Sequence, residues 1–270
     1  MSEIIRELTG VPRTLLLPLR GRAEAQADPY PLFQDPVAVK WFKLVGWDKE
    51  LDRLYSKSSQ ASRIVAAIRT YHHDQIASAH IAKYSHPIVV ELGAGLSSRF
   101  HRIGQNTHFW FELDLPVVTE LRHKLDTQTQ QHQFISASVL DFDWMDTLPK
   151  VAPENILFIA EGLLMYLDIN DVQQLISVMR SRFPGATLDM EVVGHSAKIS
   201  NQIFTEIGAP LKWFINNEED LRDMGLQVVN SWSMYQLYQE RWPLHWKSFL
   251  RFMTQFPYFR NTYLIVETKL

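Results

Sequence analysis

Hydrophobic residues fall into short runs from about position 88 onward, and stretches with helix-compatible spacing separate these runs. Short runs of apolar, β-branched and aromatic residues are typical of buried strands. The predicted strands lie at 88–92, 108–113, 134–136, 156–160 and 187–193, and the predicted helices at 116–125 and 170–183. This alternation predicts an α/β fold, a doubly wound parallel sheet with helices on both faces. Two later runs, 226–229 and 263–266, should close one edge of the sheet, with the last strand antiparallel.

The segments outside this alternation indicate how the chain is divided. Five prolines interrupt the first fifty residues, which predicts short helices and loops wrapped on the core rather than a separate domain. Apolar residues recur at helical spacing from 51 to 84. A Trp- and Phe-rich insert at about 232–258 should be helical, mostly core, and partly a roof over an apolar pocket. We therefore expect a single domain over 1–270, with an N-terminal segment, 1–50, and a core, 51–270, that carries the insert.

Composition narrows the class of protein. The 270 residues are 46% hydrophobic and carry a formal net charge of −3, which predicts a globular chain and gives no reason to expect nucleic acid or a membrane as a partner. The chain has no cysteine, so disulfides, thiolate nucleophiles and cysteine metal sites are excluded. The first ten residues lack a signal-peptide core, and no apolar run approaches the ~20 residues that span a bilayer. A soluble, cytoplasmic protein is expected, and its oligomeric state is left open.

A glycine turn and an acidic residue follow the first two strong strands. Gly93, Ala94 and Gly95 come directly after the first strand, and Asp114 stands nineteen residues after Gly95, at the end of the second. Ligands of open α/β sheets bind at the carboxyl ends of the strands, where glycines let the backbone approach and an acid accepts hydrogen bonds from ribose hydroxyls. The pair predicts a nucleoside-containing cofactor, although the glycines alone would also suit a tight structural turn.

The residues around the turn discriminate between cofactors. A dinucleotide fold needs a third glycine for close helix packing, and Ser98 occupies that position. No Walker lysine follows, which disfavours a nucleoside triphosphate. Glu91, before the glycines, suits a methyltransferase better than a dehydrogenase. A nicotinamide-dependent oxidoreductase and a non-catalytic binding protein of the same fold remain as alternatives.

Three sequence blocks carry a more specific signal. They are VELGAGL at 90–96 with Arg99 and Phe100 close behind, ELDLP at 112–116, and AEGLLMYL at 160–167. In these blocks the chain resembles the leucine carboxyl methyltransferase family, and in particular its bacterial branch of tetracenomycin polyketide O-methyltransferases. The resemblance extends from about Leu15 to the C-terminus. It implies a class I, Rossmann-like methyltransferase that uses S-adenosylmethionine, with the segment 1–50 as a helical lid over the active site.

The resemblance also implies roles for matching positions. The glycine turn packs on the methionine part of the cofactor, Asp114 takes the ribose hydroxyls, and Glu161 lies by the sulfonium and amino end. Arg69 holds the methionine carboxylate. The family usually has GAGLDTR where this chain has Ser97-Ser98-Arg99, and an aspartate near adenine where it has Ser138, so Asp141 is the candidate substitute. The implied cofactor-binding residues are Arg69, Glu91, Gly93, Ala94, Gly95, Asp114, Leu115, Ser138, Val139, Asp141, Glu161 and Gly162.

The acceptor is less clearly marked in the sequence. A carboxylate has a pKa near ~4 and needs no base at neutral pH, whereas a phenol near ~10 needs one. No HExxH motif occurs and no compelling base stands out, so no metal is expected and a carboxylate is favoured over a hydroxyl. Tyr166 and His195 are the candidate catalytic residues, and Arg20 and Arg22 are candidates to hold an anionic acceptor. A small molecule and a protein C-terminus both remain open as that acceptor.

Overall fold

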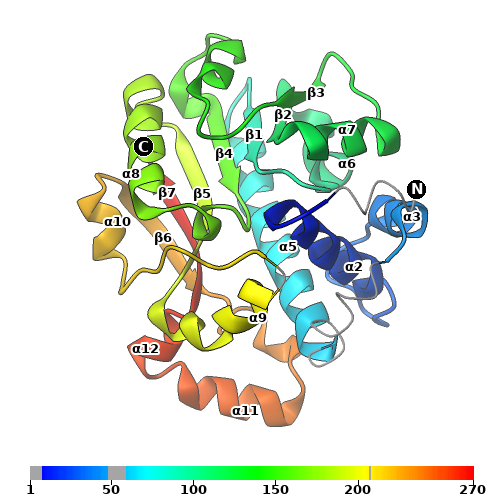
Figure 1. The fold of residues 1–270 in the computed structure, drawn as a ribbon, viewed down its shortest axis with the longest axis vertical. Helices are drawn as coiled ribbons and strands as arrows, with labels where there is room; N and C mark the ends of the chain where they lie inside the picture. Colours follow the sequence, from blue (N-terminus) through cyan, green and yellow to red (C-terminus); the bar gives the residue numbers. More distant parts are fainter. Residues whose placement is uncertain (1–7, 48–58, 207) are drawn as a thin grey trace.

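A mixed sheet forms the centre of the computed structural model, which describes residues 8–47, 59–206 and 208–270 (Figure 1). In this part of the chain the sheet has seven strands in the order β3-β2-β1-β4-β5-β7-β6. β1 to β5 pair in parallel, while β7 is antiparallel to both of its neighbours. The strands are β1 (Ile88–Leu92), β2 (Phe109–Asp114), β3 (His132–Ser136), β4 (Ile156–Ala160), β5 (Thr187–Val193), β6 (Gln227–Ser233) and β7 (Tyr263–Lys269). The expected fold class, with an antiparallel last strand, is confirmed.

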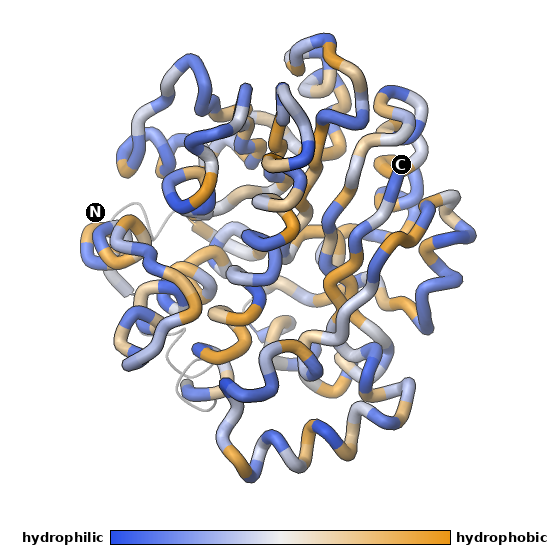
Figure 2. Tube along the Cα trace, turned by 180° about the vertical axis from the view of Figure 1, so that it is seen from behind, coloured by the Kyte–Doolittle hydropathy of each residue, from blue (hydrophilic) through white to orange (hydrophobic). Residues whose placement is uncertain are grey.

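The two faces of the sheet are buried by different helices because strand side chains alternate between faces. Val89 and Trp110 pack toward the long helix α5 (Ser59–Lys83) and α6 (Arg99–Ile103). Val90 and Phe111 belong to the opposite, larger cluster, which includes α8 (Ile169–Arg182). The hydrophobic colours of Figure 2 accordingly gather in the inner strands. Both faces are covered, as the alternation of strands and helices predicts.

The described N-terminal part is built into the core. It forms η1 (Val11–Leu15), α2 (Leu16–Ala25) and α3 (Pro36–Val45), and its Leu16, Leu19 and Trp41 pack against α7 (Pro116–Leu125). Asp35 caps α3 by accepting a hydrogen bond from the Ala38 N–H at 2.8 Å. This arrangement agrees with a segment wrapped on the core. The helix expected from 51 is described from Ser59, and its first residues lie outside the described part of the chain.

The C-terminal half adds short helices around the sheet edge. The predicted aromatic insert contains α11 (Leu244–Met253), which lies along the periphery of the molecule at the lower edge of Figure 1. Its Leu250, together with Trp242, packs against Ile68 of α5. No helix among the described residues is long and apolar enough to cross a membrane. The remaining helices are α9 (Asn201–Glu206), α10 (Glu219–Asp223), α11 (Leu244–Met253) and α12 (Pro257–Arg260), with 3-10 turns η3 (Gly104–Asn106), η4 (Phe142–Thr147), η5 (Pro153–Asn155), η6 (Leu164–Tyr166), η7 (His195–Ser200) and η8 (Gln239–Arg241).

Candidate active site

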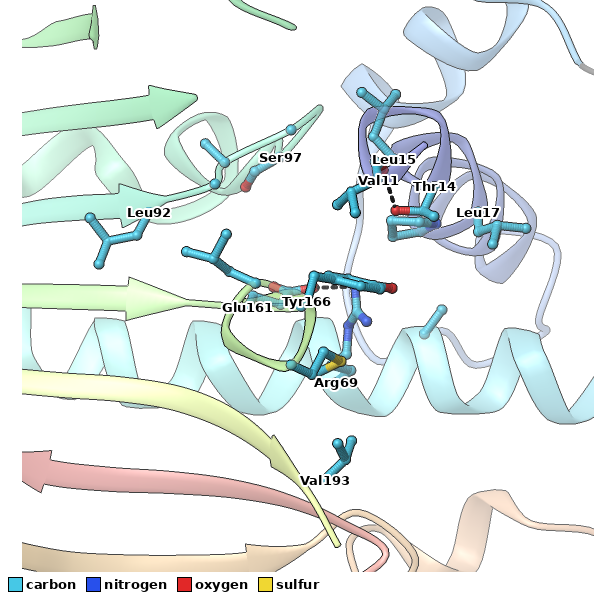
Figure 3. Close-up of a pocket in the computed structure, with 18 of the residues that line it drawn as sticks. Val11, Thr14, Leu15, Leu17, Arg69, Leu92, Ser97, Glu161, Tyr166 and Val193 are labelled. Carbon is cyan, nitrogen blue, oxygen red and sulfur yellow. Dashed lines mark hydrogen bonds and ion pairs between the residues drawn. The ribbon is translucent and has the colours of Figure 1, made fainter. Parts of the chain in front are cut away.

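A cavity of about 780 Å³ opens at the carboxyl ends of β1, β2 and β4. Its volume lies in the range of small-molecule and cofactor sites. One half is polar and is built from these strand ends, and the other is apolar and is closed by η1, α2 and α11. In Figure 3, Tyr166, Glu161 and Arg69 lie together in the middle of the site and face the residues of η1 and α2. The position matches the general rule for ligands of open α/β sheets.

The glycine turn after β1 requires glycine for two reasons. Gly93 and Gly95 have φ of 64° and 54°, in the left-handed region that other residues rarely adopt. A Cβ on Gly93 would also lie only 2.8 Å from Leu163 Cδ1. Gly93, Ala94 and Gly95 all line the cavity, so their backbone is open to a ligand.

Asp114 closes the same corner of the cavity. Its Oδ2 accepts a hydrogen bond from the Gly95 N–H at 2.6 Å, and its Oδ1 accepts one from the Leu115 N–H at 2.7 Å. Burial raises the pKa of Asp114 to about 6, although both backbone hydrogen bonds act in the opposite direction. An ionised carboxylate has about four lone-pair sites, so capacity remains for two hydroxyl groups. Leu115, Ser138 and Val139 line the cavity beside it.

Glu161 and Arg69 form an ion pair in the middle of the cavity. Arg69 Nη2 lies 2.7 Å from Glu161 Oε1, and Arg69 Nη1 donates to the Tyr263 hydroxyl at 3.3 Å. Burial alone would raise the pKa of Glu161, but the guanidinium groups of Arg69 and Arg99 outweigh it and hold that pKa well below its usual range. Glu161 is therefore a carboxylate at any ordinary pH. Tyr263 had no signal in the sequence, because it stands in a strand-like run with no motif around it.

Arg99 is the centre of the ion-pair network beneath the site. Its side chain is 1% exposed and contacts three carboxylates. Nε donates to Asp74 at 2.8 Å, while Nη1 and Nη2 donate to Glu91 and Glu161. Glu91 therefore lines the cavity, but its carboxylate is committed to Arg99 and to the indole N–H of Trp110. The sequence motif included Arg99 without revealing this role.

Further buried charged residues lie next to Arg69. Glu191 Oε1 is 3.5 Å from Arg69 Nε and 3.2 Å from His73 Nε2, and His73 Nδ1 is 2.6 Å from Asp189. Burial would lower the pKa of His73, but the neighbouring Asp189 and Glu191 raise it to about 10. His73 is thus a buried cation that holds two acids of β5 together. Neither acid stood out in the sequence, because both lie within an apolar strand.

The apolar half of the cavity meets the polar half at Tyr166. Burial raises the pKa of the Tyr166 hydroxyl above its ordinary value, so it remains protonated at neutral pH. Arg22 also lines the cavity and is held by Asp35 at 3.5 Å and by the Leu96 carbonyl at 2.5 Å. The expected aromatic roof is present, since Tyr235, Trp242, Trp246 and Leu250 line this half. No histidine or lysine stands among the lining residues in the described part of the chain.

Three candidate residues lie outside the cavity lining. His195 follows β5 in η7 and stacks on Phe214, with ring centroids 5.9 Å apart. Arg20 lies on α2, where its Nε is 2.6 Å from Glu24 Oε1. Asp141 is exposed in the turn after β3, whereas Ser138 and Val139 of the same turn face the cavity. None of these three side chains lines the cavity, because Arg20 pairs with Glu24 along α2, His195 stacks on Phe214 and Asp141 is exposed, and their roles in the site stay predictions.

One group outside the cavity has metal-ligand chemistry. His101, Asp126 and His132 present ligand atoms within 4.8 Å of one another. His101 Nε2 lies 2.7 Å from Asp126 Oδ2, and the same carboxylate oxygen is 3.4 Å from Arg122 Nη2. A guanidinium already competes for this carboxylate, so the group is explained by its own ion pairs.

Comparison with known proteins identifies the family. The sequence profile of the leucine carboxyl methyltransferase family matches residues 16–180. The "Tetracenomycin polyketide synthesis O-methyltransferase TcmP" of Streptomyces glaucescens is 32% identical over 240 residues, which cover 87% of this chain and 86% of the relative. The chain belongs to the leucine carboxyl methyltransferase family. The resemblance in the three sequence blocks, and with it the assignment as an O-methyltransferase, is confirmed.

Solved structures agree on the fold of this methyltransferase. A DUF574 family protein from Streptomyces avermitilis superposes with a TM-score of 0.60 at 10% identity, covering 88% of this chain and 97% of that one. A candidate methyltransferase from Thermobifida fusca gives a TM-score of 0.57 at 14% identity, covering 78% and 81%. At such identities the likeness concerns the fold alone.

S-adenosylmethionine is the expected cofactor of a methyltransferase of this family, and the polar half of the cavity fits it. The backbone of the glycine turn lines the cavity, and a Cβ on Gly93 would clash with Leu163 Cδ1 at 2.8 Å. Asp114 has acceptor capacity for ribose hydroxyls, and Arg69 lines the cavity while its Nε lies 3.5 Å from Glu191 Oε1. The site therefore offers a backbone cradle, an acceptor for a sugar and an arginine for a carboxylate.

Proposed function

We propose that this protein transfers a methyl group from S-adenosylmethionine to a carboxylate oxygen of an apolar small molecule or peptide. The observation that carries the proposal is the composition of the cavity. The polar half of the cavity suits a nucleoside and adjoins an apolar half. The described lining contains no histidine or lysine to act as a base. The name of the tetracenomycin relative supports an oxygen acceptor of polyketide type.

The polar half supports a specific placement of the cofactor. The backbone of Gly93 to Gly95 packs along its methionine part, and Asp114 accepts hydrogen bonds from the ribose hydroxyls. Ser138 and Val139 lie where the family contacts adenine, and both line the cavity. Arg69 binds the methionine carboxylate. Glu161 is ionised and lies within 2.7 Å of Arg69, so it is suited to the amino and sulfonium end.

The chain's own residues supply alignment, charge and the exclusion of water. When bound, S-adenosylmethionine provides a methyl group that is already activated by its sulfonium. Glu161 stabilises positive charge on the donor side, and the walls of Leu163, Tyr166 and Trp242 keep water from the acceptor side. Holding two reactants in line can contribute about 7–11 kcal/mol to the lowering of a barrier.

A carboxylate acceptor suits the groups around the apolar half. Tyr166 can donate a hydrogen bond but cannot accept a proton while its pKa stays above the ordinary value. Arg22 lines the cavity close to the glycine turn, where it donates to the Leu96 carbonyl, and its charge would attract an anionic acceptor. A carboxylate is already ionised at neutral pH, so its methylation needs no base.

We expect the product to be a methyl ester formed at a rate that is nearly independent of pH. The measurement is kcat between about pH 6 and 8 at saturating cofactor, which keeps the titration of Asp114 out of the profile. Mild alkali should then release methanol from the product, and His195→Ala should retain most of the activity. An alkali-stable ether, a rate that climbs steeply with pH and a severely impaired His195→Ala variant would together show a hydroxyl acceptor.

Arg69→Lys should weaken cofactor binding by about tenfold, because lysine cannot reproduce the planar fork that binds a carboxylate. Calorimetry with S-adenosylhomocysteine measures the effect without turnover. Arg20→Lys is the matched control, since Arg20 lies outside the cavity lining. If Arg69→Lys binds as tightly as the wild type, Arg69 serves the ion-pair network and not the cofactor.

A further inference from the structure

The outer surface of α11 and α12 is unusually apolar for a solvent-facing surface. Leu244 is 80% exposed and Phe252 is 58% exposed, and Phe249 lies between them on the same helix. Phe256 continues this surface beyond the end of α11, with its ring 5.6 Å from that of Phe252. The exposed apolar side chains, here called the α11 patch, are Leu244, Trp246, Phe249, Phe252, Phe256 and Tyr258. Contiguous exposed aromatic surface of this kind marks an interaction site.

The charge of the same segment has one sign. Between Glu240 and Glu267 the chain has four cations, Arg241, Lys247, Arg251 and Arg260, and no acid. Lys247 and Arg251 lie on α11 itself, one half-buried and one exposed, and neither pairs with an acid in the described part of the chain. The chain as a whole carries −3, so its net charge conceals this local excess.

We infer that the α11 patch rests on an anionic membrane surface. A helix that exposes Phe and Leu side chains and carries Lys and Arg in the same segment can lie in the plane of a membrane interface, with its rings among the acyl chains and its cations at anionic headgroups. α11 lies along the outer edge of the molecule with no described element beyond it (Figure 1), so its ten residues can lie flat on such a surface. The net charge of the chain, by contrast, gave no reason to expect a membrane as a partner.

The charge pattern favours a membrane over a second copy of the chain. A symmetric dimer centred on the α11 patch would bring each segment against itself, because the same surface is used on both subunits. Two segments that each carry four cations and no acid would then be brought together. Anionic headgroups supply the missing charge.

The position of α11 connects this surface to the cavity. Trp246 and Leu250 of α11 line the apolar half of the cavity, while Phe249 and Phe252 face outward. A membrane in contact with the patch would therefore lie one helix away from the acceptor half. This step rests on the proposed function, and it implies an acceptor that partitions into lipid.

The experiment is co-sedimentation of the full chain with phospholipid vesicles. We expect binding to phosphatidylcholine vesicles that contain about 30% phosphatidylglycerol, at least about tenfold weaker binding to phosphatidylcholine alone, and release at about 0.5 M NaCl. Phe249→Ser with Phe252→Ser, and separately Lys247→Glu with Arg251→Glu, should each weaken binding by about tenfold or more. Matched controls elsewhere are Ile199→Ser, which is also an exposed apolar residue, and Lys40→Glu with Lys43→Glu on α3.

Binding of S-adenosylhomocysteine by each variant reports that the fold is intact and tests the proposed function separately. Failure of the wild type to bind either vesicle, or binding of the α11 variants at wild-type affinity, would overturn the inference. A third outcome would also overturn it: the wild type forms a dimer that does not bind vesicles, and Phe249→Ser with Phe252→Ser converts this dimer to a monomer. A second copy of the chain would then be the occupant of the α11 patch.

Discussion

Arg99→Met should lower the free energy of unfolding by about 3–5 kcal/mol, the usual cost of removing one partner from a buried ion pair. Arg99 is 1% exposed and contacts Asp74, Glu91 and Glu161. In the variant, Asp74 still pairs with Arg102, and Glu161 still pairs with Arg69. Glu91 loses its ion pair with a guanidinium and retains only hydrogen bonds. Urea denaturation measures the change.

Two further variants make this result interpretable. Combining Arg99→Met with Glu91→Gln should cost less than the sum of the single changes, because the double variant leaves no unpaired charge on Glu91. Arg222→Met removes an exposed arginine that pairs with Glu219 at 2.6 Å and should change stability by less than about 1 kcal/mol. A loss for Arg99→Met as small as that of Arg222→Met would mean that the network contributes little to stability.

Asp114→Asn should weaken binding of S-adenosylhomocysteine by about ten- to a hundredfold, the equivalent of roughly 1.5–3 kcal/mol for charge-assisted hydrogen bonds. The amide can still accept one backbone hydrogen bond, so the turn at Gly95 should survive while the carboxylate is lost. Asp141→Asn is the matched control, because Asp141 is exposed and outside the cavity lining. Calorimetry on both variants checks the expectation, and equal affinities would place the ribose elsewhere.

The titration of Asp114 should also make the affinity for S-adenosylhomocysteine depend on pH. Burial raises the pKa of Asp114 to about 6, and the ionised form is the one that accepts hydrogen bonds from two hydroxyls. Affinity should therefore be constant from about pH 7 to 8 and should fall as the pH drops below 6. Asp114→Asn should lack this dependence. A wild-type affinity that stays flat down to pH 5 would show that Asp114 is not the titrating ligand.

Local patterns were sufficient for much of the fold. β1, β4, β5 and α7 have the predicted bounds, because each is a compact apolar or amphipathic run with a proline, glycine or acid at its end. β3 was predicted only from 134, yet it begins at His132, which is polar but pairs with Trp110 of β2. A polar residue can be part of a strand when a residue of the adjacent strand pairs with it. The local sequence does not show which residue of another strand will lie beside it.

Some features of the candidate site could likewise be predicted from the sequence, and others could not. The sequence by itself determined the glycine turn and Asp114, because positive φ and a strand-end acid have short-range signatures. Only the tertiary structure decided which charges meet. Glu191 of β5 and Tyr263 of β7 meet Arg69 of α5, His73 pairs with Glu191, and His195 stacks on Phe214. Side-chain pairing between distant elements depends on how helices and strands pack, and no local period or spacing encodes that geometry.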